Sequence, residues 1–326
     1  MADVAVVAGV SHMTVSRVLN DPSSVKPETR DRVQAAMRSL GYRPNSAARA
    51  LASGRTRRIG VLALASALYG PTSTLLSIET AARVAGYHLD IVRLPSVTRR
   101  SLVEAADGLQ SRGVDGIIGI TPHVWAPSAL RSAVSDLPLV AVEGASGPLA
   151  TVAVDQEKGA TLATEHLLAL GHATVWHVAG PRDWLEAKAR VRAWRETLLR
   201  AGRPVPPVLP GGWGVHSGYV AGRRLAAERD RTAVFVANDQ MALGVLRALA
   251  EADIDVPGQV SVVGFDDVPE AAYFAPPLTT VRQDFDRVGL RALQLLLDQM
   301  ADGSGEERHV VVEPRLVVRQ SAAPPP

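Results

Sequence analysis

The stretch VAVVAGVSHMTVSRVLN, Val4–Asn20, predicts two short helices that meet at a tight turn. We expect the first helix over Asp3–Ala8, because Gly9 supplies the permissive backbone that a turn needs. Ser11 then stands where a hydroxyl can accept from the free N–H groups that open the second helix.

The second helix is predicted to have one apolar and one polar face. Val10, Val15 and Val18 recur at helical spacing and should face inward. The outward positions are then His12, Met13, Ser16 and Arg17. Such a face fits a helix that enters the major groove of DNA, whereas the alternative is an ordinary αα-hairpin whose polar face is merely solvated.

A third helix and a basic segment follow. KPETRDRVQAAMRSLG, Lys26–Gly41, has proline at the first helical position and a terminal glycine. Through Arg58 the chain carries ten Lys or Arg against four Asp or Glu, whereas the remainder carries 25 against 29. A charge run is often just a solvated face, but beside a helix-turn-helix it favours attraction to phosphate.

Three motifs in this order carry a family resemblance: VSHMTVSRVLN, ETRDRVQAA and LGYRPNSAARAL. They closely resemble the amino-terminal part of lac repressor family transcription factors. The resemblance implies a helix-turn-helix DNA-binding domain over residues 1–44 and a hinge helix with linker over 45–57. In the family this helix, here Ser46–Ala52, orders on DNA, and Leu51 beside Ala52 would occupy the minor groove. A flexible linker is the alternative.

The side chains predicted to contact DNA fall into two groups. Base edges should be read by His12, Met13 and Arg17, which point outward from the recognition helix. Phosphates should be contacted by Ser11, Asn20 and Thr29.

From Ile59 onward, apolar strands alternate with helical segments, which is typical of a parallel α/β fold. Strands are predicted at Arg58–Ala65, His88–Leu94, Gly116–Ile120, Leu139–Val142, Thr151–Val154, Val175–Ala179, Ala233–Ala237 and Val260–Gly264. Helices are predicted near Thr74–Ala85, Arg99–Arg112, Pro127–Ser135, Lys158–Leu170, Leu185–Ala201, Ser217–Glu228, Gln240–Ala250 and Arg287–Met300. Eight such steps favour two sheets with a ligand cleft between them.

The family resemblance extends through this region. DQEKGATLATEHLLALGH, HVAGP, VANDQMALGVLRAL, VSVVGFDD and PPLTTVRQDF resemble the effector-binding core of the family, and most of all that of the member after which it is named. This implies two Rossmann-like subdomains similar to periplasmic sugar-binding proteins, within a core over 58–320. The first would hold about 58–155 and 284–315, the second about 156–282 and 316–320, with a disordered tail over 321–326.

A sugar site needs polar groups for hydroxyls and an aromatic plate for the ring. Position by position, the resemblance assigns these side chains to the effector: Leu68, Gly70, Pro71, Thr74, Glu143, Arg190, Trp213, Asn238, Asp266, Gln283 and Phe285. Four positions depart from the pattern, because Glu143 replaces an aspartate, Val154 an aromatic residue, Glu186 a serine and Gly119 an asparagine. Glu186, four residues before Arg190, is expected to pair with it. A neutral sugar or glycoside is favoured, with galactosides among the candidates.

Other classes of function are disfavoured by what the sequence lacks. There is no cysteine, phosphate-binding G-x-x-x-x-G-K-[ST] loop or H-E-x-x-H pair, so we expect no cofactor and no metal. A carbohydrate-active enzyme could recruit Glu143, Asp239 and Asp266 as acid and base. A sugar-binding protein of a transport system would share the core but should carry a signal peptide instead of a DNA-binding head. We therefore expect a cytoplasmic regulator, not an enzyme, without a membrane segment.

The ends of the sequence lead to two further expectations. Family members have several residues before the position of Asp3, so either the first helix is frayed or the start lies upstream of Met1. A homodimer is expected because a helix-turn-helix of this class reads a pseudo-palindrome. The ending SAAPPP has no leucine heptads, which disfavours a tetramer. The sequence thus predicts a sugar-responsive repressor that binds operator DNA.

Overall fold

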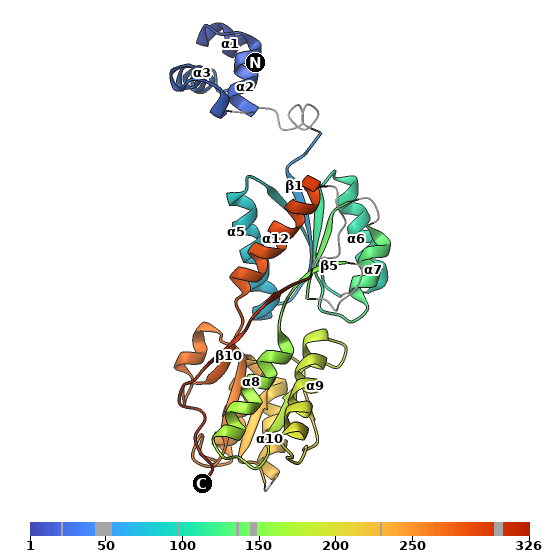
Figure 1. The fold of residues 1–326 in the computed structure, drawn as a ribbon, viewed down its shortest axis with the longest axis vertical. Helices are drawn as coiled ribbons and strands as arrows, with labels where there is room; N and C mark the ends of the chain where they lie inside the picture. Colours follow the sequence, from blue (N-terminus) through green and yellow to red (C-terminus); the bar gives the residue numbers. More distant parts are fainter. Residues whose placement is uncertain are drawn as a thin grey trace. The chain divides into compact units, whose positions relative to one another are not determined.

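The computed structural model describes residues 1–20, 22–42, 54–96, 98–134, 137–143, 149–228, 230–302 and 309–326. Contacts divide the chain into two units, Met1–Arg57 and Arg58–Pro326 (Figure 1). The hinge helix predicted over Ser46–Ala52, with Leu51 and Ala52, lies outside the described residues.

The first unit is a small helical head. Its helices are α1 (Ala2–Ala8), α2 (His12–Asn20) and α3 (Pro27–Ser39), with a short 3₁₀ turn, η1 (Pro22–Ser24). They pack around the buried side chains of Val4, Ala5, Ala8, Val15, Val18, Val33 and Ala36. The helix-turn-helix expected from the sequence is therefore formed.

The turn between α1 and α2 has the predicted chemistry. Gly9 ends α1 in the left-handed conformation at φ 60°, which a glycine adopts without strain. The hydroxyl of Ser11 accepts from the backbone N–H of Thr14 at 3.1 Å and so caps α2.

The first sheet of the second unit has the strand order β11-β5-β4-β3-β1-β2. Its strands are β1 (Arg58–Leu64), β2 (His88–Leu94), β3 (Gly116–Ile120), β4 (Leu139–Val142), β5 (Ala150–Val154) and β11 (His309–Val312). All pairs are parallel. Val61 packs with α5 (Tyr69–Val84) and α12 (Phe285–Asp302), whereas Leu62 packs with α6 (Arg99–Ser111) and α7 (Ala126–Ala133). Helices thus cover both faces (Figure 1).

The second sheet has the order β12-β10-β9-β8-β6-β7. Its strands are β6 (Trp176–Ala179), β7 (Leu209–Pro210), β8 (Ala233–Val236), β9 (Ser261–Asp266), β10 (Thr279–Arg282) and β12 (Arg315–Val317). Val234 packs with α10 (Val215–Ala227) and α11 (Asp239–Glu251) on one face. Phe235 packs with α8 (Gln156–Ala169) and α9 (Leu185–Arg200) on the other.

The chain passes between the two sheets three times: from β5 to α8, from β10 to α12, and from β11 to β12. The two-sheet α/β prediction is confirmed, and the eight predicted strands are present with ends shifted by at most two residues. The short strands β7, β10, β11 and β12 and the 3₁₀ segment η2 (Pro269–Tyr273) were not predicted.

The carboxyl-terminal residues differ from the predicted disorder. Ser321 is fully buried, and its hydroxyl donates to the carbonyl of Val262 at 2.6 Å. The backbone N–H of Ala323 donates to the hydroxyl of Ser261 at 2.9 Å. The prediction considered composition alone, whereas this segment runs beside β9 and satisfies its polar groups there.

No single described helix is long and apolar enough to cross a membrane. Helices α1 and α2 reach that length and composition only as a pair, which is bent by 100° at its break.

Candidate functional site

Helix α2 presents the predicted base-reading side chains to solvent. His12, Met13 and Arg17 are exposed, Met13 to 65%, while Val15 and Val18 of the same helix are buried in the core of the head. Because the packing and the exposed side chains lie on opposite faces, this outer face is free to enter a groove.

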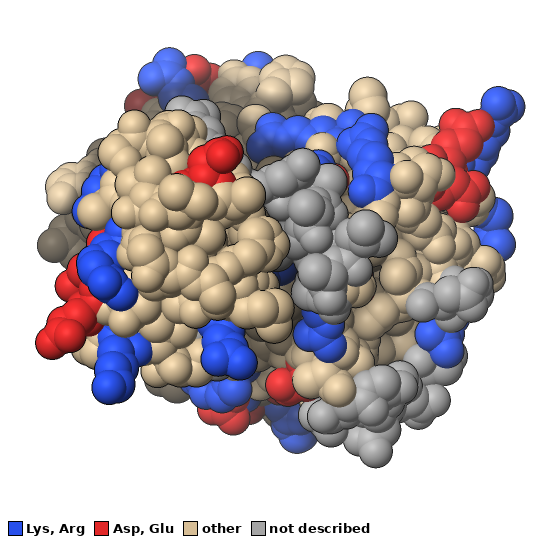
Figure 2. Space-filling view, turned by 90° about the horizontal axis from the view of Figure 1, so that it is seen from above, with Lys and Arg blue, Asp and Glu red and all other residues tan. Residues whose placement is uncertain are grey.

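The predicted phosphate contacts differ in their surroundings. Ser11 is exposed, although its hydroxyl already caps α2 and lies 2.9 Å from that of Thr14. Thr29 is half-buried in the first turn of α3. The side chain of Asn20 lies outside the described residues. On the face of the molecule in Figure 2, Lys and Arg side chains are more abundant than Asp and Glu.

All eleven residues predicted to bind the effector line one pocket in the second unit. They come from the start of α5, the ends of β4 and β9, helix α9, the loop before α10, the start of α11 and the crossing into α12. Eight further residues complete the lining: Tyr69, Ile120, Thr121, Pro122, Val142, Gln156, Trp184 and Glu186.

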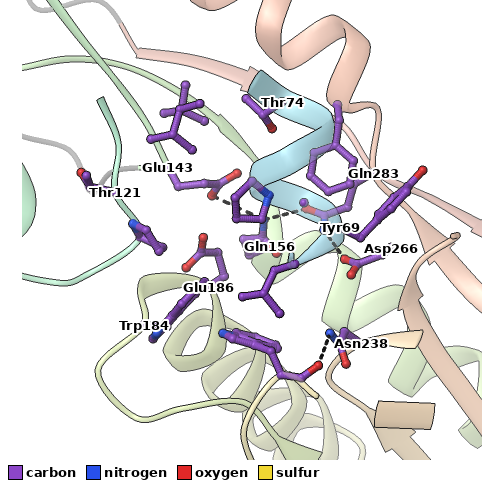
Figure 3. A pocket seen from close by; sticks show the side chains of 18 of the residues that line it. Tyr69, Thr74, Thr121, Glu143, Gln156, Trp184, Glu186, Asn238, Asp266 and Gln283 are labelled. Carbon is purple, nitrogen blue, oxygen red and sulfur yellow. Dashed lines mark hydrogen bonds between the residues drawn. The ribbon is translucent and has the colours of Figure 1, made fainter. Parts of the chain in front are cut away.

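Gln156 stands at the centre of the polar network in the pocket (Figure 3). Its Nε2 donates to Oε1 of Gln283 at 2.9 Å, and Gln283 donates in turn to Asp266 at 2.6 Å. Its Oε1 accepts from Nε and Nη2 of Arg190 at 2.9 and 2.8 Å. Gln156 was not predicted as a site residue, but its place at the predicted boundary between the first subdomain, which ends near 155, and the second, which begins near 156, could have indicated it.

Arg190 is 3% exposed and already has several partners. Besides Gln156, its Nη1 donates to the carbonyl of Ala237, and its guanidinium carbon lies 3.7 Å from the centroid of the Phe265 ring. The predicted pairing with Glu186 is not made through Oε2 of that residue, which is buried and has no hydrogen-bond partner within the described part of the chain. Arg190 therefore holds other parts of the pocket lining in place and also faces the cavity.

Three carboxyl groups line the pocket in a poorly hydrated environment. Burial raises the pKa of Glu143 to about 7, although the N–H of Val154 and the charge of Arg190 oppose the shift. Burial, and then the charge of Glu143, raise the pKa of Glu186 to about 8. Burial also raises that of Asp266 to about 6, opposed by Arg190 and by the hydrogen bond from Gln283. Such shifts are frequent at binding sites.

The backbone is strained at two of these acids. Glu143 has φ 57° and Asp266 has φ 115°, both in a region that side chains with a Cβ seldom adopt. Strain of this kind persists where the surrounding structure enforces it, which is common at ligand sites.

Trp213 forms an aromatic wall of the pocket. Its ring meets that of Trp184 edge-on at 5.3 Å between centroids, and its Nε1 has no partner among the described residues. Gly180 makes this placement possible, because a Cβ there would lie 2.4 Å from the Trp213 ring. Asn238 donates to the carbonyl of Trp213 at 3.1 Å and also caps α11 through Oδ1.

The described residues hold no group of three or more His, Asp or Glu side chains placed to bind a metal ion. A helix-turn-helix head with an exposed outer face, followed by two Rossmann-like subdomains with a polar pocket, is the architecture of one class of protein, the ligand-responsive DNA-binding regulator.

The comparisons identify the family. Residues 1–45 match bacterial regulatory proteins of the lacI family, and residues 164–322 match a periplasmic binding protein-like domain. The lactose operon repressor of Escherichia coli K12 is 34% identical, over 99% of this chain and 90% of the relative, and the ribose operon repressor of the same strain is 31% identical over 99% of each. The chain belongs to the lacI family of bacterial regulatory proteins.

Solved structures agree with this assignment. A lac repressor dimer bound to operator and the anti-inducer ONPF matches with a TM-score of 0.88 and 33% identity, over 98% of each chain. The complex of the transcriptional regulator CelR with cellobiose matches with a TM-score of 0.74 and 30% identity, also over 98% of each.

Proposed function

We propose that this protein is a transcriptional repressor that binds operator DNA as a homodimer and releases it when a sugar or glycoside occupies the pocket. The observation that carries the proposal is the convergence of all eleven expected effector positions on one polar pocket. His12, Met13 and Arg17 would read bases, Ser11, Asn20 and Thr29 would contact phosphates, and Leu51 and Ala52 would enter the minor groove. A repressor that acts on operator DNA would work in the cytoplasm.

The coupling would act through the crossings between the two sheets. Gln156 follows β5 and Gln283 follows β10, so the network that lines the pocket also joins two of the three crossings. A ligand that binds both subdomains stabilises one arrangement of these crossings over another. If that arrangement holds the heads unfavourably for DNA, ligand affinity and operator affinity are linked.

An enzyme is disfavoured by the position of Asp239. This carboxyl group is fully buried outside the pocket lining, where it accepts from Thr280 at 2.5 Å and from the N–H of Val268 at 2.9 Å. Asp239 is one of the three acids that a hydrolase could recruit, but its hydrogen bonds stabilise the fold and it does not line the pocket. We propose that the protein is not an enzyme and needs no cofactor.

The test is a release assay with a matched pair of variants. Operator sequences are first selected from a random duplex library, and release is then followed by fluorescence anisotropy during titration with neutral and amino monosaccharides and disaccharides. Asp266→Asn should bind the selected DNA but need at least tenfold more sugar for release. Asp253→Asn is the control, because Asp253 also has a positive φ but is exposed. Equal release from both variants would place the effector elsewhere.

A further inference from the structure

Three polar atoms in the pocket have no partner within the described part of the chain. They are Oγ1 of Thr121, Oε2 of Glu186 and Nε1 of Trp213, on side chains that all line the cavity. Thr121 is 1% and Trp213 9% exposed. Buried polar groups are nearly always satisfied, so these atoms indicate where a ligand supplies the missing partners.

The pocket also carries more negative than positive groups. Among the described residues that line it, Glu143, Glu186 and Asp266 are acidic and Arg190 is the single cation. The hydrogen bonds of Arg190 run to Gln156 and Ala237 instead of to a carboxylate. In Figure 3 the carboxyl groups of Glu143 and Glu186 point toward the same part of the cavity. Two neighbouring buried carboxylates resist joint ionisation unless a cation lies with them.

Aromatic side chains also line this pocket. Four of the 14 aromatic residues in the chain contribute to the lining: Tyr69, Trp184, Trp213 and Phe285. Tyr69 and Phe285 meet edge-on at 5.7 Å between centroids. Aromatic faces attract ammonium groups, and carboxylates accept their hydrogen bonds. A neutral hydroxyl satisfies one acceptor, whereas an ammonium group also stabilises the ionised form of both acids.

We propose that the effector is an amino sugar, a saccharide that carries a protonated primary amine, and that its ammonium group binds between Glu143 and Glu186. This rests on the proposed function, because it names the ligand class of that same pocket. Burial, which disfavours the ionised form, raises the pKa of both acids, and an ammonium group between them would offset that cost.

The test compares matched saccharides on the full-length protein by isothermal titration calorimetry at pH 7.5. The probes are galactosamine, galactose and N-acetylgalactosamine, together with the corresponding glucose series. Each amine is thus compared with its hydroxyl parent and with a neutral amide at the same position. The wild type should bind at least one amine ten or more times more tightly than both neutral counterparts.

Glu186→Gln should reduce that ratio at least tenfold, whereas Glu186→Asp, which keeps the charge, should retain part of it. Glu196→Gln is the control, because Glu196 lies on the same helix but is exposed. If neutral sugars bind as tightly as the amines, or Glu186→Gln leaves the ratio unchanged, the amino-sugar proposal is overturned and the repressor proposal stands. If no saccharide binds, both fail.

Discussion

The head and the pocket use functional side chains in opposite ways. In the head, Arg17 and Met13 are exposed and the packing is done by Val15 and Val18 on the other face of the same helix. In the pocket, Arg190 and Asp266 are buried, and their side chains form hydrogen bonds with neighbouring side chains of the pocket lining. A substitution in the head should therefore change recognition alone, whereas one in the pocket should change recognition and stability together.

The largest expected effect is that of Arg190→Ala. The substitution leaves Gln156 and the carbonyl of Ala237 without their donors and removes the cation that faces three buried carboxyl groups. The free energy of unfolding should fall by about 3–5 kcal/mol. Urea denaturation followed by tryptophan fluorescence measures this for the second unit, since all five tryptophans lie in it. A loss below 1 kcal/mol would contradict the structural role of Arg190.

The next effect depends on pH. Glu186 has a pKa of about 8 in the folded protein, above its ordinary value, so the folded state retains a proton that the unfolded state releases. Its contribution to stability therefore falls as pH rises from about 5 to 8. Glu186→Gln should be more stable than the wild type at pH 8 by about 2 kcal/mol, and by less at pH 5.

Denaturation at both pH values, with Glu196→Gln as control, checks this expectation. The charged groups that act on Glu186 are Glu143 from the end of β4, Asp266 from β9 and Arg190 from its own helix, and all three remain in the variant. An equal difference between variant and wild type at pH 5 and pH 8 would show that Glu186 is ionised throughout.

Arg17→Ala tests the opposite side of the comparison. A guanidinium can donate two hydrogen bonds to a guanine edge, so operator affinity should fall by about 1–3 kcal/mol and preference should relax at one base pair. The unfolding curve of the head should not move, because Arg17 is exposed. Anisotropy titrations on single-base variants of the selected operator measure the first effect, and a shifted melting curve would contradict the second.

The smallest effect is expected two residues beyond Arg190. Arg192 forms an ion pair with Glu157, but both side chains are about half exposed, at 60% and 46%. Exposed pairs contribute little, so Arg192→Ala should change the free energy of unfolding by less than about 1 kcal/mol. If the free energy of unfolding fell as much as in Arg190→Ala, burial would not explain why the two arginines are expected to differ.

Periodicity and turn chemistry were sufficient to predict most of the fold. The strands β3 and β4 were located because each is an unbroken apolar run, fully buried and bounded by turn residues. The strands β11 and β12 have three to four residues and partly exposed side chains, so no local pattern distinguishes them. They exist because β5 and β10 offer free edges, which is a tertiary cause.

The candidate site was predictable in position but not in connectivity. The resemblance placed Arg190 and Asp266 in the pocket because motifs fix positions along the chain. It could not show that Arg190 binds Gln156 instead of Glu186, because that choice depends on how three separate elements pack. Spacing along a helix predicts which side chains share a face, but not which of several possible partners a side chain binds.

The late position of β11 has a consequence for how the protein is made. Its residues pair with β5 at the edge of the first sheet, and α12 packs against that sheet just before them in sequence. The first subdomain thus begins at β1 but is closed by α12 and β11, which leave the ribosome after all of the second subdomain except β12 and the residues that follow it. During translation the second subdomain emerges while the first still lacks its last helix and edge strand, so the nascent chain exposes the apolar face that α12 later covers.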